Sequence, residues 1–159
     1  MKTSFSSLDF RQTMGKFATG VTVVTTPDGE GVHGMTANAF MSVSLEPPLV
    51  LVSVSKRANT HRNIKKANCF GVNILRDDQR DLSDHFAGRR NADLEQKMQY
   101  YWHHDIPLLS DCLANIACRL WASYDGGDHT LYVGEVFALK HNEANPLIFF
   151  EGSYRTLEQ

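Results

Sequence analysis

The sequence predicts a single domain, residues 1–159, of mainly β structure: an antiparallel barrel with a few inserted helices. A chain of 159 residues is an ordinary length for one domain and is long enough to bury a core. About seven runs of alternating or β-branched residues follow one another through short turns. Most strands follow one another directly, and only a few helices are inserted between them. A parallel sheet would need a regular alternation of strands and helices, so the pattern favours an antiparallel sheet.

The composition is that of an ordinary globular protein. Sixteen basic and eighteen acidic residues leave a net charge of −2, which gives no reason to expect nucleic acid as a partner. The first ten residues lack the apolar segment of a signal peptide, and the run Leu49–Val52 is far too short to span a bilayer. Three cysteines fit a reducing compartment better than a disulfide framework. We therefore expect a cytoplasmic protein without a membrane segment.

The first helix is expected to begin at Ser6 or Ser7, with Asp9 favoured near its N-terminus. Apolar residues at positions 10, 14 and 17 predict a stripe packed on the core. The β-branched run Val21–Thr26 predicts a strand. Gly29–Gly34 then matches G-x-G-x-x-G, but no helix begins within the motif, so a glycine-rich hairpin is the better interpretation.

The middle of the chain predicts strands over Phe40–Leu45 and Leu49–Ser55, separated by two prolines. A short helix capped by Asn59 or Thr60 follows, and then a strand over Cys69–Leu75.

The remaining elements are expected in the following order. A helix begins at Asp77 or Asp78 and ends at Gly88. Residues 91–105 have helical spacing with an irregular aromatic end. The last strands lie over residues 116–122, 131–135 and 146–150.

The main functional signal is the stretch from His33 to Thr60. Its small polar segment, Met35–Ala39, would let a flat ligand lie against the backbone. Its hydroxyl-rich and basic segment, Ser53–Thr60, stands where a helix begins, which suits a phosphate. Together the two segments point to a phosphorylated planar cofactor.

Five parts of the chain match a known family: positions within 10–25, the block Gly34–Val50, Ser83–Gly88, Gly127–Val136, and positions within 146–155. Through them the sequence resembles the short-chain flavin reductases, the reductase components of two-component flavin monooxygenases of the 4-hydroxyphenylacetate and phenol hydroxylase type. The resemblance covers nearly the whole chain. It implies an FMN-binding split β-barrel that forms homodimers, with the flavin near the dimer interface.

The resemblance also implies an activity: an NAD(P)H-dependent reductase that transfers a hydride to N5 of FMN or FAD and supplies reduced flavin to a separate monooxygenase. Hydride transfer needs stacked rings more than an acid–base residue, which fits a sequence without a catalytic dyad motif. The choices between NADH and NADPH and between FMN and FAD stay open. The alternatives are a flavin carrier or sensor without turnover and a pyridoxamine-phosphate-oxidase-like enzyme, which would need a second basic cluster.

Carried over position by position, the resemblance implies a set of cofactor-binding residues. They are Met35, Thr36, Ala37, Asn38 and Ala39 for the flavin ring and ribityl chain; Ser53, Val54, Ser55, Asn59 and Thr60 for the phosphate; His85 and Phe86 over the flavin; and Gly152, Tyr154 and Arg155 at the nicotinamide, together with His129 as the catalytic candidate.

Several of these residues have simpler interpretations. His129 could be a solvent-facing turn residue, and His85 a helix residue favoured by the dipole at a C-terminus. A role for Lys56 and Arg57 at the phosphate rests on their charge alone. His103–Asp105 lacks the spacing of a metal site, so no metal is expected.

Overall fold

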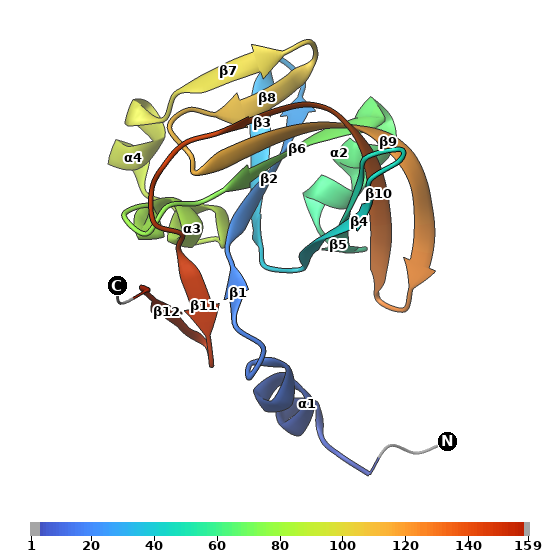
Figure 1. Ribbon diagram of the computed structural model, residues 1–159, viewed down its shortest axis with the longest axis vertical. Helices are drawn as coiled ribbons and strands as arrows, with labels where there is room; N and C mark the ends of the chain where they lie inside the picture. Colours follow the sequence, from blue (N-terminus) through green and yellow to red (C-terminus); the bar gives the residue numbers. More distant parts are fainter. Residues whose placement is uncertain (1–3, 158–159) are drawn as a thin grey trace.

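The computed structural model describes residues 4–157 (Figure 1). Seven strands form one antiparallel sheet in the order β3-β2-β6-β9-β10-β5-β4, so the predicted mainly β, antiparallel architecture is confirmed. These strands are β2 (Thr22–Asp28), β3 (Gly31–Ala37), β4 (Phe40–Ser44), β5 (Leu49–Ser55), β6 (Cys69–Ile74), β9 (Ala114–Gly126) and β10 (His129–His141).

Four helices and two smaller sheets complete the described part of the chain. A three-stranded sheet has the order β1-β11-β12, and β7 pairs with β8. The bounds are α1 (Ser7–Met14), α2 (Asn59–Ala67), α3 (Arg80–Phe86), α4 (Ala92–Lys97), β1 (Thr19–Gly20), β7 (Tyr100–His103), β8 (Ile106–Leu109), β11 (Ile148–Phe150) and β12 (Ser153–Arg155).

The large sheet curls because its two edge strands are consecutive in the chain. β3 and β4 occupy opposite edges, yet only Asn38 and Ala39 separate them. The carbonyl of Ala39 accepts a hydrogen bond from the amide of Ser53 on β5 (3.1 Å), which holds the link against the sheet. Asn38 and Ala39 therefore lie where the two edges of the curled sheet meet, and both are exposed.

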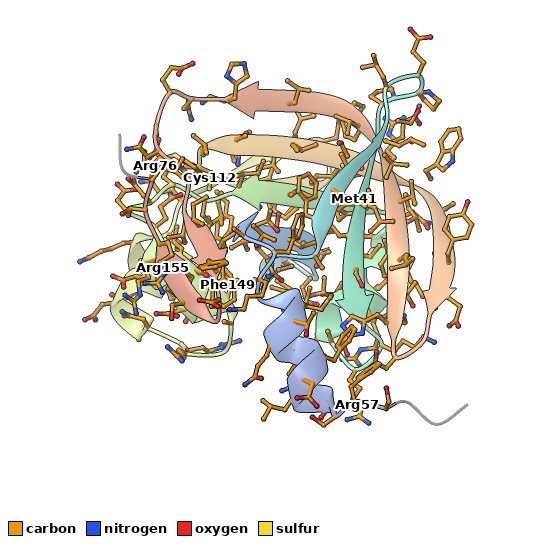
Figure 2. All side chains as sticks on the ribbon, turned by 60° about the horizontal axis from the view of Figure 1, so that its bottom comes forward. Met41, Arg57, Arg76, Cys112, Phe149 and Arg155 are labelled. Atoms are coloured by element: carbon orange, nitrogen blue, oxygen red, sulfur yellow. The ribbon has the colours of Figure 1, made fainter. Side chains whose placement is uncertain are left out.

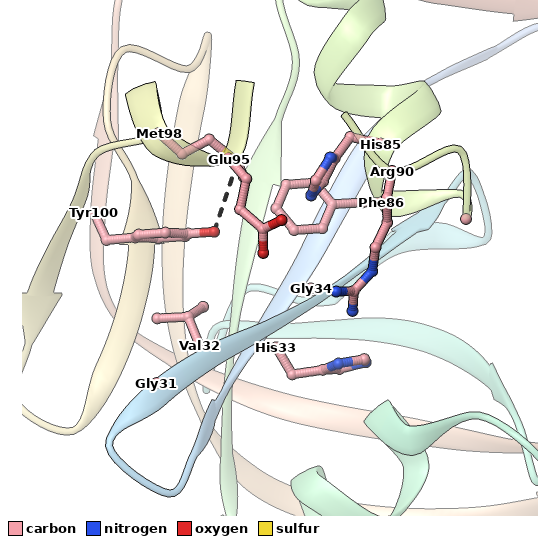
Figure 3. Close-up of a pocket in the computed structure, with 11 residues that line it drawn as sticks. Gly31, Val32, His33, Gly34, His85, Phe86, Arg90, Glu95, Met98 and Tyr100 are labelled. Carbon is pink, nitrogen blue, oxygen red and sulfur yellow. Dashed lines mark hydrogen bonds between the residues drawn. The ribbon is translucent and has the colours of Figure 1, made fainter. Parts of the chain in front are cut away.

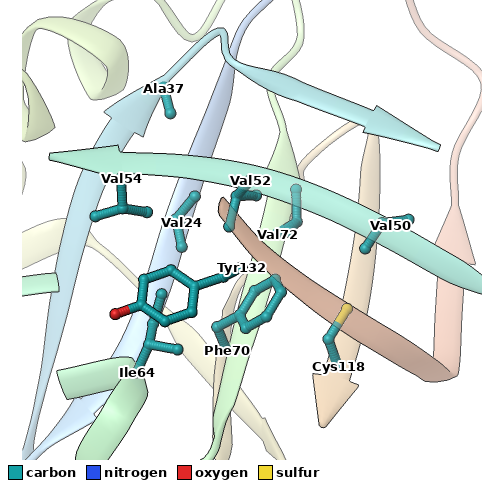
Figure 4. Packing of buried hydrophobic residues seen from close by; sticks show 10 residues of the cluster. All are labelled: Val24, Ala37, Val50, Val52, Val54, Ile64, Phe70, Val72, Cys118 and Tyr132. Atoms are coloured by element: carbon teal, nitrogen blue, oxygen red, sulfur yellow. The ribbon is translucent and has the colours of Figure 1, made fainter. Parts of the chain in front are cut away.

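The inside of the curl holds the main hydrophobic core (Figure 4). Phe70 and Tyr132 are its largest fully buried side chains, and Ile64 from α2 packs with them. The Tyr132 hydroxyl donates to the carbonyl of His61 (3.0 Å), so this buried polar group has a partner and α2 is tied to β10.

A buried asparagine network joins the β7–β8 hairpin to the sheet. The side-chain oxygen of Asn73 accepts from the amide of Leu109 and from Asn115 Nδ2, both at 2.8 Å. Asn73 Nδ2 donates to the carbonyl of Val23 (2.8 Å) and to Thr25 Oγ1 (3.0 Å). One fully buried side chain thus connects β2, β6, β8 and β9. The aromatic segment expected to be irregular is therefore an ordered hairpin.

The first helix begins as predicted but packs differently. Ser6 and Asp9 form a reciprocal capping box, with Asp9 N to Ser6 Oγ at 3.1 Å and Ser6 N to Asp9 Oδ2 at 2.9 Å. The predicted packing of its apolar stripe on the core is wrong within one chain: Phe10, Met14 and Phe17 are 52%, 53% and 79% exposed. α1 extends from the barrel through β1 (Figure 1), so its stripe has no core beneath it.

Two predicted helix starts differ from the structure by one to three residues. α2 is preceded by Ala58, which makes no side-chain capping bond, so Asn59 and Thr60 lie in the first turn and are not caps. α3 begins at Arg80 after Gln79, because the backbone at Arg76 is held by the Gln79 side chain (2.9 Å) and forms a turn first.

Two further observations concern the cysteines and the helices. Cys69, Cys112 and Cys118 are buried free thiols. Within residues 4–157, each helix is too short or too polar to cross a membrane.

Candidate functional site

A cavity of about 420 Å³ opens between β3, α3 and the segment that carries α4 and the start of β7 (Figure 3). Its walls combine apolar and aromatic groups with an arginine, a glutamate and two histidines. Such a surface suits a planar ligand that also carries charge. The lining residues are Gly31, Val32, His33, Gly34, His85, Phe86, Gly88, Arg90, Glu95, Met98 and Tyr100.

The glycine-rich hairpin lets an aromatic ring from α3 approach the backbone of β3. A Cβ atom at Gly34 would lie 2.5 Å from Cε1 and 2.6 Å from Cδ1 of Phe86, far inside van der Waals contact. His85 meets the Phe86 ring edge to face, with centroids 5.0 Å apart. The backbone amide of Asn91 donates to His85 Nδ1 (3.0 Å), which fixes the orientation of the buried imidazole. The structure thus brings His85 and Phe86 together at the cavity.

His33 connects the cavity to the first turn of α2. Its Nε2 lies 3.0 Å from Thr60 Oγ1, and the Thr60 side chain is fully buried. Burial lowers the pKa of His33, the positive charge of Arg90 lowers it further, and Asp28 opposes both. The imidazole is therefore favoured in its neutral form at the cavity wall.

The predicted phosphate segment lies at the ends of β5 and β10. Along β5 the side chain of Val54 is buried in the core, while Ser53 and Ser55 are half-buried. Lys56 Nζ bonds Asp125 Oδ1 (2.5 Å) and the carbonyl of Gly127 (2.6 Å), so this cation sits against the β9–β10 turn. A cation and two serine hydroxyls near the start of a helix can hold an anion.

Asn59, Arg57 and His129 complete this corner. Asn59 is exposed, and its side-chain oxygen accepts from Arg62 (2.5 Å). Arg57 is exposed as well. His129 pairs in register with Ser55, and its Nδ1 lies 2.7 Å from Asp128 Oδ1. The Asp128 carboxylate, hydrogen-bonded to His129, has a pKa below its usual range.

Part of the predicted flavin-ring segment contacts the rest of the protein, and the other part is exposed. Met35 packs against the core, and Ala37 belongs to it. Thr36 Oγ1 donates to the carbonyl of Ser83 on α3 (2.6 Å). Asn38 and Ala39, in contrast, are exposed at the meeting of the sheet edges. The small side chains thus leave backbone accessible where a flat ring could lie.

The predicted nicotinamide residues do not all gather in one chain. Gly152, with φ of +75°, forms the β11–β12 turn, and Arg155 is exposed on β12 (Figure 2). The Tyr154 hydroxyl lies 2.7 Å from Ser83 Oγ and 3.1 Å from Asp84 Oδ1. The tail therefore meets α3, whereas the turn between β9 and β10 lies across the molecule from β12 (Figure 1). His129 is the first residue of β10.

Sequence reasoning missed part of the cavity wall. Gly34 stands in the glycine-rich motif, but nothing local shows that Phe86 lies against it. Arg90, Glu95 and Tyr100 reach the cavity only through the packing of α4 and β7. Burial, together with the charge of Glu95, raises the pKa of Tyr100 to about 12, so its hydroxyl stays protonated. Within residues 4–157 there is no cluster of three or more His, Cys, Asp or Glu side chains able to hold a metal ion.

Comparison with known proteins identifies the relatives of this chain. The flavin reductase like domain family matches residues 14–158. An NADH-dependent flavin reductase of Rhodococcus sp. is 47% identical over 95% of this chain and 86% of its own length. The reductase component of 4-hydroxyphenylacetate 3-monooxygenase from Thermus thermophilus is 42% identical over 93% of this chain and 95% of its own length.

Solved structures agree with this assignment. A flavin reductase in its native state has a TM-score of 0.91 and 46% identity, covering 98% of this chain and 100% of that one. The NADH:FAD oxidoreductase of Streptomyces globisporus in complex with NAD and FAD fragments has a TM-score of 0.87 and 35% identity, covering 95% and 92%. The likeness confirms the predicted fold class. Since the family match and these relatives extend over nearly the whole chain, the protein belongs to the flavin reductase-like domain family.

Proposed function

We propose that this protein is an NADH-dependent flavin reductase that transfers a hydride to N5 of FMN or FAD and supplies the reduced flavin to a separate monooxygenase component. Relatives at 42–47% identity are named as NADH-dependent flavin or FMN reductases and as the reductase component of a monooxygenase. The observation that carries the proposal is the cavity in Figure 3, where Phe86 and His85 from α3 face β3 just before the exposed Asn38–Ala39 link.

The residues present fit two planar, phosphorylated ligands. The small side chains of Ala37 and Ala39 leave room for a ring, and Asn38 offers donors and an acceptor beside it. The hydroxyls of Ser53 and Ser55, close to Lys56, suit a phosphate. The aromatic walls of the cavity suit a second ring.

The protein's chemical contribution is binding and orientation. A bound flavin supplies the electron-accepting ring, and the nicotinamide supplies the hydride. Phe86 and Tyr100 form aromatic walls that exclude water from ring faces, which favours a stacked arrangement. Because an ionised carboxylate only accepts, Asp128 accepts a hydrogen bond from His129 Nδ1–H and so orients the imidazole. No residue has to act as a general acid in this step.

The test is anaerobic consumption of NADH and NADPH by the purified protein with added FMN, FAD or riboflavin. We expect turnover with NADH well above the rate without protein, and the preferred flavin identifies the cofactor. Flavin binding without turnover would instead support a carrier, and no flavin binding would contradict the site.

We further propose that the protein works as a cytoplasmic homodimer. The apolar face of α1 is open in one chain, and Met41 and Val43 on the edge strand β4 are 56% and 48% exposed. Exposed apolar groups of this size are typical of an interface. Light scattering should give twice the mass of the chain, and Phe17→Glu should shift the population toward monomer. An unchanged monomer for the wild type would contradict the dimer.

A further inference from the structure

We propose that Tyr154 is a positioning residue: its hydroxyl fixes helix α3, and with it the cavity wall of His85 and Phe86, without touching the ligand. The inference rests on the proposed function, because it concerns the same cavity. It differs from a direct role for Tyr154 at the nicotinamide, and the two roles give different results in the test below.

α3 needs contacts from outside to hold its place. It has only seven residues, Arg80–Phe86, and Gln79 before it makes no side-chain capping bond. A helix this short is not stable alone, because the free-energy cost of nucleation is larger than the gain from one or two turns of hydrogen bonds. Yet His85 and Phe86, which line the cavity, are its last two residues. Whatever holds α3 therefore sets the shape of the cavity.

Leu82 and Phe86 of α3 pack on a hydrophobic cluster, and Ser83 is the residue where hydrogen bonds from two other strands meet the helix. Its side chain is fully buried. On one side, its carbonyl accepts from Thr36 Oγ1 of β3 (2.6 Å). On the other side, its hydroxyl lies 2.7 Å from the hydroxyl of Tyr154 on β12. Helix α3 is thus clamped between β3, which leads to the flavin-ring segment, and the C-terminal hairpin.

The direction of the hydrogen bonds follows from Asp84. An ionised carboxylate only accepts, so the Tyr154 hydroxyl donates its one proton to Asp84 Oδ1 (3.1 Å). Ser83 Oγ must then be the donor in its bond to the Tyr154 oxygen. The Asp84 carboxylate also pairs with two cations, Arg89 (3.4 Å) and Arg80 (3.9 Å). The chain Ser83 to Tyr154 to Asp84 is therefore directional.

The Tyr154 ring is held independently of its hydroxyl. The guanidinium of Arg80 lies 5.1 Å from the ring centroid, and Phe149 packs against the ring edge with centroids 5.6 Å apart. Phenylalanine can keep both contacts. Tyr154→Phe therefore removes the link to α3 while the hairpin stays packed.

The experiment compares Tyr154→Phe, Ser83→Ala and the double variant with the wild type. Tyr101→Phe is the matched control, because it removes a tyrosine hydroxyl from β7 that makes no hydrogen bond among the described residues. The measurements are the FMN dissociation constant by flavin fluorescence, KM and kcat for NADH, thermal melting, and amide hydrogen exchange of residues 80–87.

We expect Tyr154→Phe to weaken FMN binding and to raise the KM for NADH about three- to tenfold, the size expected from one lost hydrogen bond. The weaker FMN binding should appear at temperatures far below the melting temperature. Amide hydrogen exchange of residues 80–87 should be faster in this variant. Tyr101→Phe should change neither ligand binding nor this exchange. Since Tyr154→Phe already removes the bond to Ser83 as well as the bond to Asp84, the double variant should be no worse than Tyr154→Phe alone.

Two results would overturn the proposal. If Tyr154→Phe lowers the melting temperature but leaves ligand constants and exchange of residues 80–87 unchanged, the hydroxyl is only structural. If its effect on ligand binding adds in full to that of Ser83→Ala, Tyr154 contacts the ligand directly. Failure of the proposed function is separate: a wild type without NADH turnover contradicts the reductase, while hydrogen exchange still tests the clamp.

Discussion

Adding one methyl group at Gly34 should close the cavity by moving the Phe86 ring. The Cβ of an alanine would lie 2.5 Å and 2.6 Å from two Phe86 ring carbons and 3.2 Å from a third. Ordinary contact begins at about 3.4 Å, so the ring or strand must shift by roughly 1 Å. Gly34 is in the middle of β3 and pairs with Thr25, so the backbone has little freedom to move.

The expected cost is that of overpacking, about 1–3 kcal/mol. For a domain of this size, that corresponds to a fall in melting temperature of roughly 3–9 °C. Because Phe86 forms a wall of the cavity, we also expect weaker FMN binding and a higher KM for NADH. Calorimetry and flavin titration measure both effects on the same sample.

Two further variants separate crowding from other causes. Gly20→Ala is the control, because a Cβ there meets nothing within 4 Å, and it should leave melting and binding unchanged. Gly34→Ala combined with Phe86→Leu should recover stability relative to Gly34→Ala, because the smaller side chain relieves the clash. If Gly34→Ala melts and binds as the wild type does, Phe86 does not approach β3 as described, and the cavity assignment is wrong.

Three more outcomes follow from single side chains. Asn73→Ala should lower the free energy of unfolding, measured by chemical denaturation, by about 2–4 kcal/mol, because it leaves buried hydrogen-bonding groups of several strands unpaired. A loss below about 1 kcal/mol would contradict the asparagine network. Burial lowers the pKa of His33 in the folded state, so the unfolded state takes up a proton first as the pH falls below about 6.5, and the free energy of unfolding drops. His33→Gln should reduce this drop between pH 7 and 5.5. If the variant and the wild type have the same pH profile, His33 is not the group responsible. Lys56→Met should weaken FMN binding more than riboflavin binding. The free energy of unfolding should change little, because the Lys56–Asp125 pair is exposed. Equal effects on both flavins would exclude a phosphate contact.

The sequence predicts elements whose signals are local. The β-branched run at residues 21–26, the capping of α1 by Ser6 and the glycine-rich hairpin all follow from neighbouring residues, and the structure contains them. The errors occur where distant contacts decide. The start of α3 depends on Gln79, and the apolar face of α1 was assigned to a core that one chain does not provide.

Some features of the candidate site could likewise be predicted from neighbouring residues, and others could not. The open backbone at Asn38 and Ala39 could be anticipated from the small side chains of a single segment. Their place where the sheet edges meet could not, because it depends on the order of all seven strands. The approach of Phe86 to Gly34 could not, because α3 and β3 are about fifty residues apart and only tertiary packing brings them together. The same holds for Tyr154, whose hydroxyl reaches α3 rather than open space.

Hydroxyls in the flavin and phosphate segments serve two different purposes, which residue type alone does not distinguish. Those of Thr36 and Thr60 are engaged by Ser83 and His33, so they stabilise the arrangement of α3 and α2 around the cavity. Within residues 4–157, the Ser55 oxygen accepts from the amide of Arg57 (3.3 Å), and its O–H has no protein acceptor. If a buried hydroxyl exchanged its protein partner for a ligand, the binding free energy would change little, because one hydrogen bond replaces another. We therefore expect ligand recognition along this stretch to depend on hydroxyls such as that of Ser55, while Thr36 and Thr60 set where those groups stand.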